Sequence, residues 1–335
     1  MSVGASFEMD SELGERRIIE IILESLDVMP SMPIPFGDDA SAVEIDRERL
    51  VVIKADMLVG KTDVPPGMSL RQAARKAVVM NISDLAAKGV EPVAVLSSIG
   101  LPRGLKKEEV REIGLGLNEG AREYGAYIIG GDTNEAQDLV ISCSVLGFCE
   151  KNAFMKRIGA HPGDIVAVTG PFGRPAAGLK ILLENLSAPV TIRDSLVEAV
   201  LMPRARLKEG LALASSGTVT SSIDSSDGLA WSLYELSRAS SVGFLIEDVP
   251  VPPEVERFAE NHNLNPLELG LYGGEEYELV VTVKPELWDK AEEAVEKLDA
   301  LLIEIGRVIE EKKILLETSE GVKSIEARGW EHFKT

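Results

Sequence analysis

Cysteine, histidine and aromatic residues are all scarce in this sequence. Its 335 residues include two cysteines and three histidines, and only 5% are aromatic although 45% are hydrophobic, so the core must be mostly aliphatic. Cys143 and Cys149 fall on one predicted strand, and no disulfide framework or zinc pattern is present, which fits a reducing cytosol. The histidines are too few and too scattered to predict a zinc site or a catalytic triad.

Positive charge and long apolar runs are also lacking. The formal net charge of −20 argues against non-specific binding to nucleic acid or to anionic membranes. It does not exclude an anionic substrate, because bound Mg²⁺ can invert the local sign of the charge. No segment reaches the roughly 18 apolar residues of a membrane span, and residues 1–15 do not read as a signal peptide. We expect a cytoplasmic protein with neither nucleic acid nor a membrane as partner.

The order of helical and strand-like segments predicts an α+β fold in two domains. The length suits about two domains of roughly 100–200 residues each. Two successive strands late in the first half favour a mixed sheet over a plain doubly wound one. Helices are predicted at 12–26, 69–89, 105–125 and 202–216, and strands at 50–59, 90–102, 126–134 and 138–150. A composition shift at 150–162 predicts domains of residues 1–150 and 151–335.

Aspartate interrupts or ends an apolar run at several places. The stretches are PFGDDASAV (35–43), VVIKADMLVG (51–60), VVMNISDLAA (78–87), YIIGGDTN (127–134) and SSIDSSDGLA (221–230). On the predicted helix 69–89, Asp84 and Asn81 lie close to the apolar stripe that should face the core. A carboxylate there is costly unless it is paired or holds a metal. The alternatives for Asp84 are therefore an ion pair with Arg75 or Lys76, a frayed helix end, or a metal site.

The other aspartates each have a simple explanation when taken alone. Asp56 could be a strand-end acid in solvent, Asp132 part of a Gly-Gly-Asp turn, and Asp227 the cap of the next helix. A cap at Asp227 leaves Asp224 unexplained, however. Independent local explanations also account poorly for the large number of aspartates at the ends of strands and helices. Oxygen-only ligand sets suit Mg²⁺, and such sites usually hold substrate phosphates. The residues therefore suggest an enzyme that acts on nucleotide phosphates with several Mg²⁺ ions.

Two glycine loops are further candidates for ligand contact. The loop TGPFGRPAAG (169–178) links a strand to a helix, as phosphate-binding loops do, but it lacks the P-loop pattern, and a tight turn explains it equally well. The loop YGGEEYELVV (272–281) places Glu275 and Glu276 after two glycines. These carboxylates are either a solvated turn or polar contacts to a ligand in a cleft.

Eight short motifs occur in the order seen in one known family. They are GDDASAV, ADMLV, NISDLAAKG, GGDT, PGDIVAVTG, DSSDGL, GGEEYEL and GWEHF. From about Gly14 to Phe333, the chain resembles the thiamine-monophosphate kinase family of the aminoimidazole-ribonucleotide synthetase-like (PurM-like) superfamily. NISDLAAKG and GGDT mark the superfamily, whereas GGEEYEL and GWEHF favour the kinase family within it.

The resemblance implies a PurM-like two-domain α+β architecture. The N-terminal domain would bind ATP and Mg²⁺ and dimerise through its mixed sheet, and the C-terminal domain would also be α+β. The implied reaction is ATP-dependent phosphorylation of thiamine monophosphate to thiamine diphosphate, by direct in-line transfer assisted by several Mg²⁺ ions. The implied partners are ATP, thiamine monophosphate and a second copy of the chain.

The resemblance also implies roles for individual residues, matched motif by motif. The implied Mg²⁺ ligands are Asp39, Asp56, Asp84, Asp132, Asp224 and Asp227, with Asp38 as a weaker candidate. The positions implied to contact ATP are Gly131, Asp132, Arg157 and Ser226. The positions implied to contact thiamine phosphate are Asp63, Glu275 and Trp330. An indole face against a cationic thiazolium ring is physically reasonable, while the plain alternative for Trp330 is a hydrophobic plug. No catalytic side chain is implied, because the metals position the reacting groups.

Two positions depart from the family's pattern. Many members carry Ser/Thr-Thr-Asp where this chain has Lys54-Ala55-Asp56, so a hydroxyl ligand is missing, although backbone carbonyls could serve. Many also carry His where this chain has Asp63, which bears on substrate choice. These departures keep open a catalytically dead scaffold that binds metal and nucleotide. The other alternative is a sister ATP-dependent enzyme of the aminoimidazole-ribonucleotide synthetase type.

Overall fold

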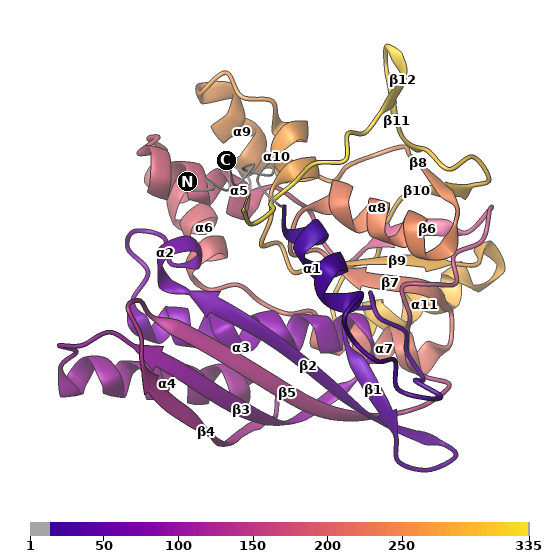
Figure 1. Ribbon diagram of the computed structural model, residues 1–335. Coiled ribbons are helices and arrows are strands. Elements are labelled where there is room, and N and C mark those ends of the chain that lie inside the picture. Colours follow the sequence, from indigo (N-terminus) through magenta and orange to yellow (C-terminus); the bar gives the residue numbers. More distant parts are fainter. Residues whose placement is uncertain (1–13, 334–335) are drawn as a thin grey trace, which may run out of the picture.

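Two sheets with helices packed against them make up the molecule (Figure 1). The structure is a computed structural model that describes residues 14–333. Helix α1 (Glu15–Leu23) comes first and falls within the predicted helix 12–26. Most of the segment 1–15, on which the signal-peptide expectation rests, lies outside the described residues. The two sheets confirm the predicted α+β fold class.

The first sheet has five strands and is mixed, as predicted. Its strands are β1 (Ser41–Glu44), β2 (Arg49–Val59), β3 (Glu91–Leu101), β4 (Tyr127–Glu135) and β5 (Val140–Glu150). They lie in the order β1-β2-β5-β3-β4. Strands β3 and β4 pair in parallel, whereas the other neighbouring strands pair antiparallel.

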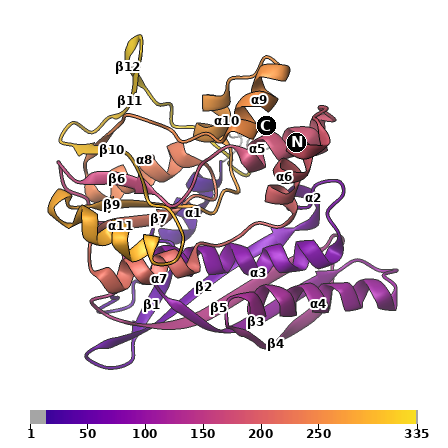
Figure 2. The ribbon, with the colours of Figure 1, turned by 180° about the vertical axis from the view of Figure 1, so that it is seen from behind.

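Two long helices, α3 (Leu70–Ala87) and α4 (Lys107–Glu123), cover one face of this sheet (Figure 2). The predicted start of α3 is confirmed, because Ser69 and Gln72 form a reciprocal capping box. In it, the Ser69 N–H donates to Gln72 Oε1 at 2.9 Å. Gly116 lets α4 approach α3 closely, since a Cβ there would lie 2.0 Å from the carbonyl oxygen of Arg71. The short helix α2 (Gly60–Asp63) connects β2 to the segment before α3.

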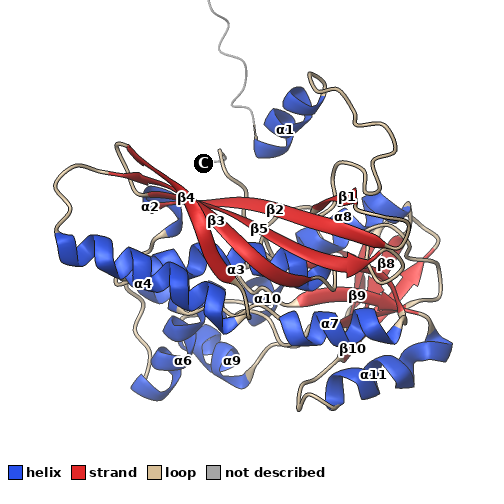
Figure 3. Ribbon diagram, turned by 90° about the horizontal axis from the view of Figure 1, so that it is seen from below, coloured by secondary structure: helices blue, strands red, loops and turns tan. Residues whose placement is uncertain are grey.

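The opposite face of the first sheet, called the open face here, carries exposed apolar side chains. Side chains alternate along β2, so Lys54 and Asp56 point toward α3 whereas Ile53 and Met57 point to the open face. Figure 3 shows α3 and α4 on the same side of the sheet. Ile129 on β4 is 67% exposed and Met57 is 55% exposed. The exposed apolar residues of these strands include Ile53, Met57, Leu96, Tyr127, Ile129 and Phe148.

The second sheet contains seven strands. They are β6 (Ile165–Val168), β7 (Val219–Asp224), β8 (Gly243–Ile246), β9 (Leu279–Val283), β10 (Ile303–Ile309), β11 (Ile314–Thr318) and β12 (Gly321–Ser324). Their order is β12-β11-β8-β10-β6-β9-β7. Strands β8 and β11 pair in parallel and the other neighbours pair antiparallel, so this sheet is mixed as well.

One of the helices that accompany the second sheet begins later than predicted. They are α5 (Arg174–Glu184), α6 (Val190–Leu201), α7 (Leu207–Ser216), α8 (Leu229–Ser240), α9 (Pro253–Asn261), α10 (Pro266–Tyr272), the 3₁₀ turn Pro285–Leu287 and α11 (Trp288–Glu296). The helix predicted at 202–216 begins only at Leu207. Pro203 lacks an N–H for a helix interior, and the segment before Leu207 is an extended connection from α6.

One of the buried hydrophobic clusters spans both halves of the chain. Helix α3 packs against α7 and β7, and a single buried cluster contains Ile82 of α3 with Leu213 of α7 and Val281 of β9. The contact is close, because a Cβ on Gly210 would lie 2.0 Å from the carbonyl oxygen of Ala86. The two parts separated by the predicted domain division at residue 150 therefore pack closely against each other. The division itself stays a prediction. Within residues 14–333, no helix is long and apolar enough to cross a membrane.

Candidate functional site

Three buried aspartates meet where the first sheet, α3 and the second sheet come together. They are Asp39 just before β1, Asp84 near the end of α3, and Asp224 at the end of β7. One carboxylate oxygen from each lies within 4.8 Å of the others. The three residues are only 4–6% exposed. We call these three residues the acidic cluster, and it brings together three of the six predicted metal ligands.

Burial and mutual repulsion act strongly on this cluster. Burial raises the pKa of Asp84 well above its usual range, and neighbouring Asp224 and Asp56 raise it further, against the opposing effect of Lys54. Burial, followed by the charge of Asp39, raises the pKa of Asp224 to about 7. Two of the three carboxyls thus resist ionisation unless more positive charge is supplied. The cluster is electrostatically suited to receive a cation.

Lys54 links the acidic cluster to Asp56. Its Nζ lies 3.0 Å from Asp56 Oδ1 and 3.1 Å from Asp84 Oδ2. Burial alone would lower the pKa of Lys54, but the charges of Asp84, Asp56 and Asp39 together raise it above its ordinary value. Asp84 therefore forms an ion pair, as one of the alternatives predicted, but its partner is Lys54. The partners suggested from the sequence, Arg75 and Lys76, bind elsewhere.

Two further cations hold the Asp38-Asp39 pair. The Nζ of the fully buried Lys88 lies 2.8 Å from Asp38 Oδ1 and 2.7 Å from Asp39 Oδ2. Arg157, predicted to contact ATP, donates from Nε to Asp39 Oδ1 at 2.7 Å. Burial would raise the pKa of Asp39, but Lys88 and Arg157 together lower it below its usual value. Asp39 is thus the member of the acidic cluster whose pKa is lowered, and its Oδ2 has no hydrogen-bond partner of good geometry among the described residues.

Helix α3 also supplies neutral side chains that orient the aspartates. The Ser83 hydroxyl donates to Asp224 Oδ2 at 2.7 Å. Asn81 accepts from the backbone N–H of Asp56 at 2.8 Å and donates to the carbonyl of Ala77 at 2.9 Å. The polar residues of this otherwise apolar helix therefore fix the ends of β2 and β7. Their inward direction agrees with the prediction made from helical periodicity.

Asp132 and Gly131 lie apart from the acidic cluster. Both are on β4, the edge strand, which β3 and β5 separate from β2. Asp132 is in register with Ser98 of β3, which is aligned with Ser142 and through it with Met57. Residues in register share a face of the sheet, so the exposed Asp132 side chain belongs to the open face. Within one chain, the sheet separates it from Asp84.

A second group of predicted residues converges between two loops and the C-terminal segment. The carbonyl of Ser226 accepts from the backbone N–H of Glu275 at 2.6 Å, and the carbonyl of Asp227 accepts from that of Trp330 at 3.1 Å. A Cβ on Gly274 would lie 3.5 Å from the Cβ of Trp330. Burial, then the nearby Glu15, raises the pKa of Asp227 to about 6. The Trp330 side chain is 51% exposed, so it is not a buried hydrophobic plug.

Lys76 connects this second group to Asp63. The fully buried Lys76 donates from Nζ to the carbonyl of Asp63 at 3.0 Å and forms an ion pair with Glu275. The Asp63 carboxylate itself accepts from the N–H of Val59 at 2.7 Å. Glu275 has a φ of +68°, a conformation that costs energy for a residue with a Cβ. The three predicted substrate positions, Asp63, Glu275 and Trp330, are thereby gathered around one ion pair.

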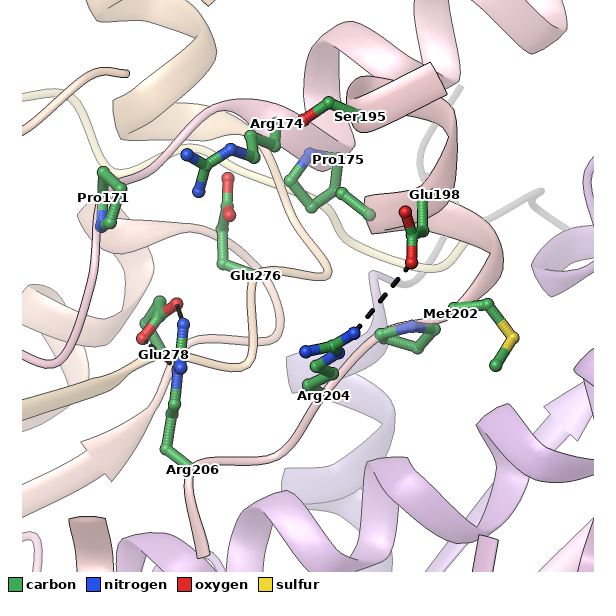
Figure 4. Close-up of a pocket in the computed structure, with 12 residues that line it drawn as sticks. Pro171, Arg174, Pro175, Ser195, Glu198, Met202, Arg204, Arg206, Glu276 and Glu278 are labelled. Atoms are coloured by element: carbon green, nitrogen blue, oxygen red, sulfur yellow. Dashed lines mark hydrogen bonds and ion pairs between the residues drawn. The ribbon is translucent and has the colours of Figure 1, made fainter. Parts of the chain in front are cut away.

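Glu276, unlike its neighbour Glu275, lines a cavity of about 310 Å³ (Figure 4). It accepts from the N–H of Gly173 in the glycine loop 169–178. Burial raises its pKa well above the usual range. The cavity is polar, and Arg206 on its wall donates to Glu278 at 2.8 Å. The glycine loop thus contacts a carboxylate of the chain itself.

Sequence reasoning missed the buried lysines of this site. Lys88 and Lys76 were not singled out as site residues, and Lys54 was noted only as a departure from the family's pattern. A signal was available, because Lys54 lies two residues before Asp56 and must share its face of a strand. Lys76 and Lys88 both lie on the predicted helix 69–89, and an ammonium that such a helix turns toward the core needs a partner.

The sequence is similar to proteins of one family over nearly its whole length. The family model described as AIR synthase related protein, N-terminal domain, matches residues 37–149. Thiamine-monophosphate kinase of Pyrococcus horikoshii is 35% identical over 326 residues, covering 97% of this chain and 97% of that relative. The enzyme of the same name from Nitrosopumilus maritimus is 34% identical over 325 residues, covering 97% of this chain and 100% of the relative.

Solved structures show the same fold. AaThiL complexed with AMPPCP and TMP superposes with a TM-score of 0.85 at 29% identity, covering 98% of this chain and 100% of that one. Thiamine monophosphate kinase from Aquifex aeolicus gives a TM-score of 0.79 at 27% identity, covering 92% and 97%. E. coli HypE, a hydrogenase maturation protein, gives 0.69 at 21% identity with 93% and 97% covered, and shows the fold alone. The PurM-like architecture is confirmed, and the chain belongs to the thiamine-monophosphate kinase family.

Proposed function

We propose that this protein transfers the γ-phosphoryl group of ATP to thiamine monophosphate and forms thiamine diphosphate. The observation that carries the proposal is the acidic cluster, in which three buried carboxylates from distant segments converge. It lies in a chain of the thiamine-monophosphate kinase family, whose relative AaThiL has been solved with AMPPCP and TMP. Family membership favours this reaction over that of a sister enzyme.

The acidic cluster fits Mg²⁺ as its cation. Mg²⁺ prefers oxygen ligands, usually one or two carboxylates together with substrate phosphates, and the cluster offers only oxygen atoms. Burial raises the pKa values of Asp84 and Asp224, so a bound cation would stabilise the ionised form of both carboxyls. Bound Mg²⁺ would offset the repulsion between ATP and the acceptor phosphate in this acidic protein and favour in-line transfer. We assign Mg²⁺ binding to Asp39, Asp56, Asp84, Asp132, Asp224 and Asp227, with Asp38 as a weaker candidate.

The chain's own residues position the two substrates. Arg157 and Ser226, with Gly131 and Asp132, are proposed to contact ATP. Trp330 is half exposed, and an exposed indole suits the cationic thiazolium ring; Glu275 is the carboxylate proposed to contact the same substrate. Lys76 holds Glu275 and the backbone of Asp63 in place.

The proposed reaction does not require a strong general base. The acceptor is a phosphate oxygen that is already ionised near neutral pH, so no side chain has to remove a proton from it. This agrees with a site built from carboxylates, lysines and arginine. The chain's role is to hold both substrates in line.

We further propose a homodimer that forms through the open face of the first sheet. Contiguous exposed apolar surface of this kind marks an interaction site, and Ile129, Met57 and Leu96 contribute 67%, 55% and 48% exposed side chains to it. A second copy of the chain would cover the face that also carries Asp132. The nucleotide contacts proposed for Gly131 and Asp132 would then lie at or beside the dimer interface. The cytoplasmic location and the domain division at residue 150 remain predictions.

A coupled assay of ADP release tests the proposed function. Purified protein is incubated with Mg·ATP and thiamine monophosphate, and the products are separated by chromatography. We expect thiamine diphosphate to form only when Mg²⁺ is present. ATP binding measured by calorimetry without any turnover would instead support the dead scaffold that Ala55 and Asp63 kept open.

A further inference from the structure

Lys54 occupies the point between two carboxylates where a bridging cation would bind. It lies on β2 two residues before Asp56, so both side chains face α3. Its Nζ is within 3.0 Å of Asp56 Oδ1 and 3.1 Å of Asp84 Oδ2, and its side chain is only 19% exposed. The lysine therefore joins a strand carboxylate to a helix carboxylate, inside the site and not at its rim.

A divalent ion cannot share this point with the ammonium. Two cations only a few ångströms apart in a poorly solvated site repel each other strongly. A metal bound at this point would also have to share Asp56 Oδ1 and Asp84 Oδ2 with the ammonium. Asp39 and Asp224 make no ion pair with Lys54, and their carboxylate oxygens converge with one from Asp84. These three residues form a place for metal that leaves Lys54 where it is.

We infer that the ammonium of Lys54 is a built-in cation of the site, so that this chain binds one divalent ion fewer than it would with a neutral residue at position 54. The inference rests on the proposed function only in taking the acidic cluster as the metal site. It also changes the role assigned to Asp56, which serves mainly to hold Lys54. Lys54 is thus a residue that sets the metal stoichiometry of the site.

Counting bound ions tests the inference without any reference to turnover. Mn²⁺ is used as the probe, and free Mn²⁺ is measured by electron paramagnetic resonance while the full-length protein is titrated. The Lys54→Met variant removes the charge and keeps most of the side chain's length. Lys61→Met, at an exposed lysine on α2, is the matched control. Lys54→Arg keeps a cation in place, and Lys54→Gln is a second neutral variant in case the methionine variant does not fold.

The inference predicts one additional Mn²⁺ per chain in Lys54→Met or Lys54→Gln, and the wild-type count in Lys54→Arg and Lys61→Met. The neutral variants should also melt at a lower temperature than the wild type in metal-free buffer and gain more from added Mg²⁺. Equal counts in the wild type and a folded neutral variant would overturn the inference, because the ammonium would then be leaving when metal arrives. No bound Mn²⁺ in any variant would overturn both the inference and the metal site. Kinase turnover with an unchanged count in the neutral variants would refute the inference alone.

Discussion

Each face of the first sheet carries side chains that are unusual for their surroundings. On the face covered by α3, β2 places the partly buried charges of Lys54 and Asp56 among the buried apolar Leu50, Val52 and Leu58, whereas on the open face the same strand exposes Ile53 and Met57. Charged groups are rarely buried without a partner, and large apolar patches are rarely left exposed. Both exceptions occur on one strand. We therefore propose that the covered face serves the chemistry and that the open face serves association between copies of the chain.

The difference also separates two kinds of predicted site residue. Asp84 and Asp224 meet on the covered side, where burial raises their pKa values. Asp132 belongs to the open face and is exposed. If the complete site uses Asp132 as well as the aspartates on the covered side, another molecule must cover the open face. We propose that this molecule is a second copy of the chain.

The strongest expected effect comes from the covered face. Asp84→Asn keeps the shape of the side chain but removes its negative charge, and we expect kcat to fall by about a hundredfold or more. The Asp84→Asn protein should keep the wild-type circular dichroism spectrum. Asp27→Asn, at an exposed aspartate, is the control and should retain full turnover in the ADP-release assay. Asp132→Asn is also expected to lose turnover, and unchanged rates in both Asp84→Asn and Asp132→Asn would refute the metal assignment.

A substitution on the open face should change the oligomeric state of the protein instead. Ile129→Asp places a charge on the side chain with 67% exposure at the edge of the sheet. We expect the mass measured by light scattering to fall from that of a dimer to that of one chain. Ile158→Asp is the control, because Ile158 lies outside this sheet and is 53% exposed. A dimer that survives the change at Ile129 would move the interface to another surface.

Trp330 should affect substrate affinity more than the chemical step. An exposed cation–π contact is worth about 1 kcal/mol, so Trp330→Ala should raise the KM for thiamine monophosphate about fivefold to tenfold. The KM of the Trp330→Phe variant should lie between that of the wild type and that of Trp330→Ala. The KM for ATP provides the internal control, and an equal rise in both constants would point to a general disturbance of the loop.

A smaller effect is expected in the dependence of stability on pH. Burial raises the pKa of Asp224 to about 7 in the folded protein, above the ordinary aspartate value of 3.8. The metal-free folded state therefore holds a proton that the unfolded chain has already lost. The corresponding stability is fully present below pH 3.8 and is lost as the pH rises toward 7. Urea unfolding from pH 4 to pH 8 should show a shallower decline for Asp224→Asn than for the wild type, and identical slopes would contradict the shift.

Local patterns in the sequence predicted those parts of the site that depend on one element. The start of the helix at Ser69 and the inward direction of Asp84 follow from local sequence signals, and both were confirmed. The pairing of Lys54 with Asp84 could not be predicted in the same way, since it joins residues 30 positions apart through packing of α3 on the sheet. The face of Asp132 depends on the irregular register between β3 and β4, which no local pattern encodes.

The placement of a metal among Asp39, Asp84 and Asp224 is tested most directly by crystals grown with Mn²⁺ and an ATP analogue. An anomalous difference map would locate the ions without assumptions about the reaction. The account predicts a peak within ligand distance of all three carboxylates, with Lys54 still between Asp56 and Asp84. Peaks only elsewhere, with the three carboxylates bound solely by Lys54, Lys88, Arg157 and Ser83, would contradict it.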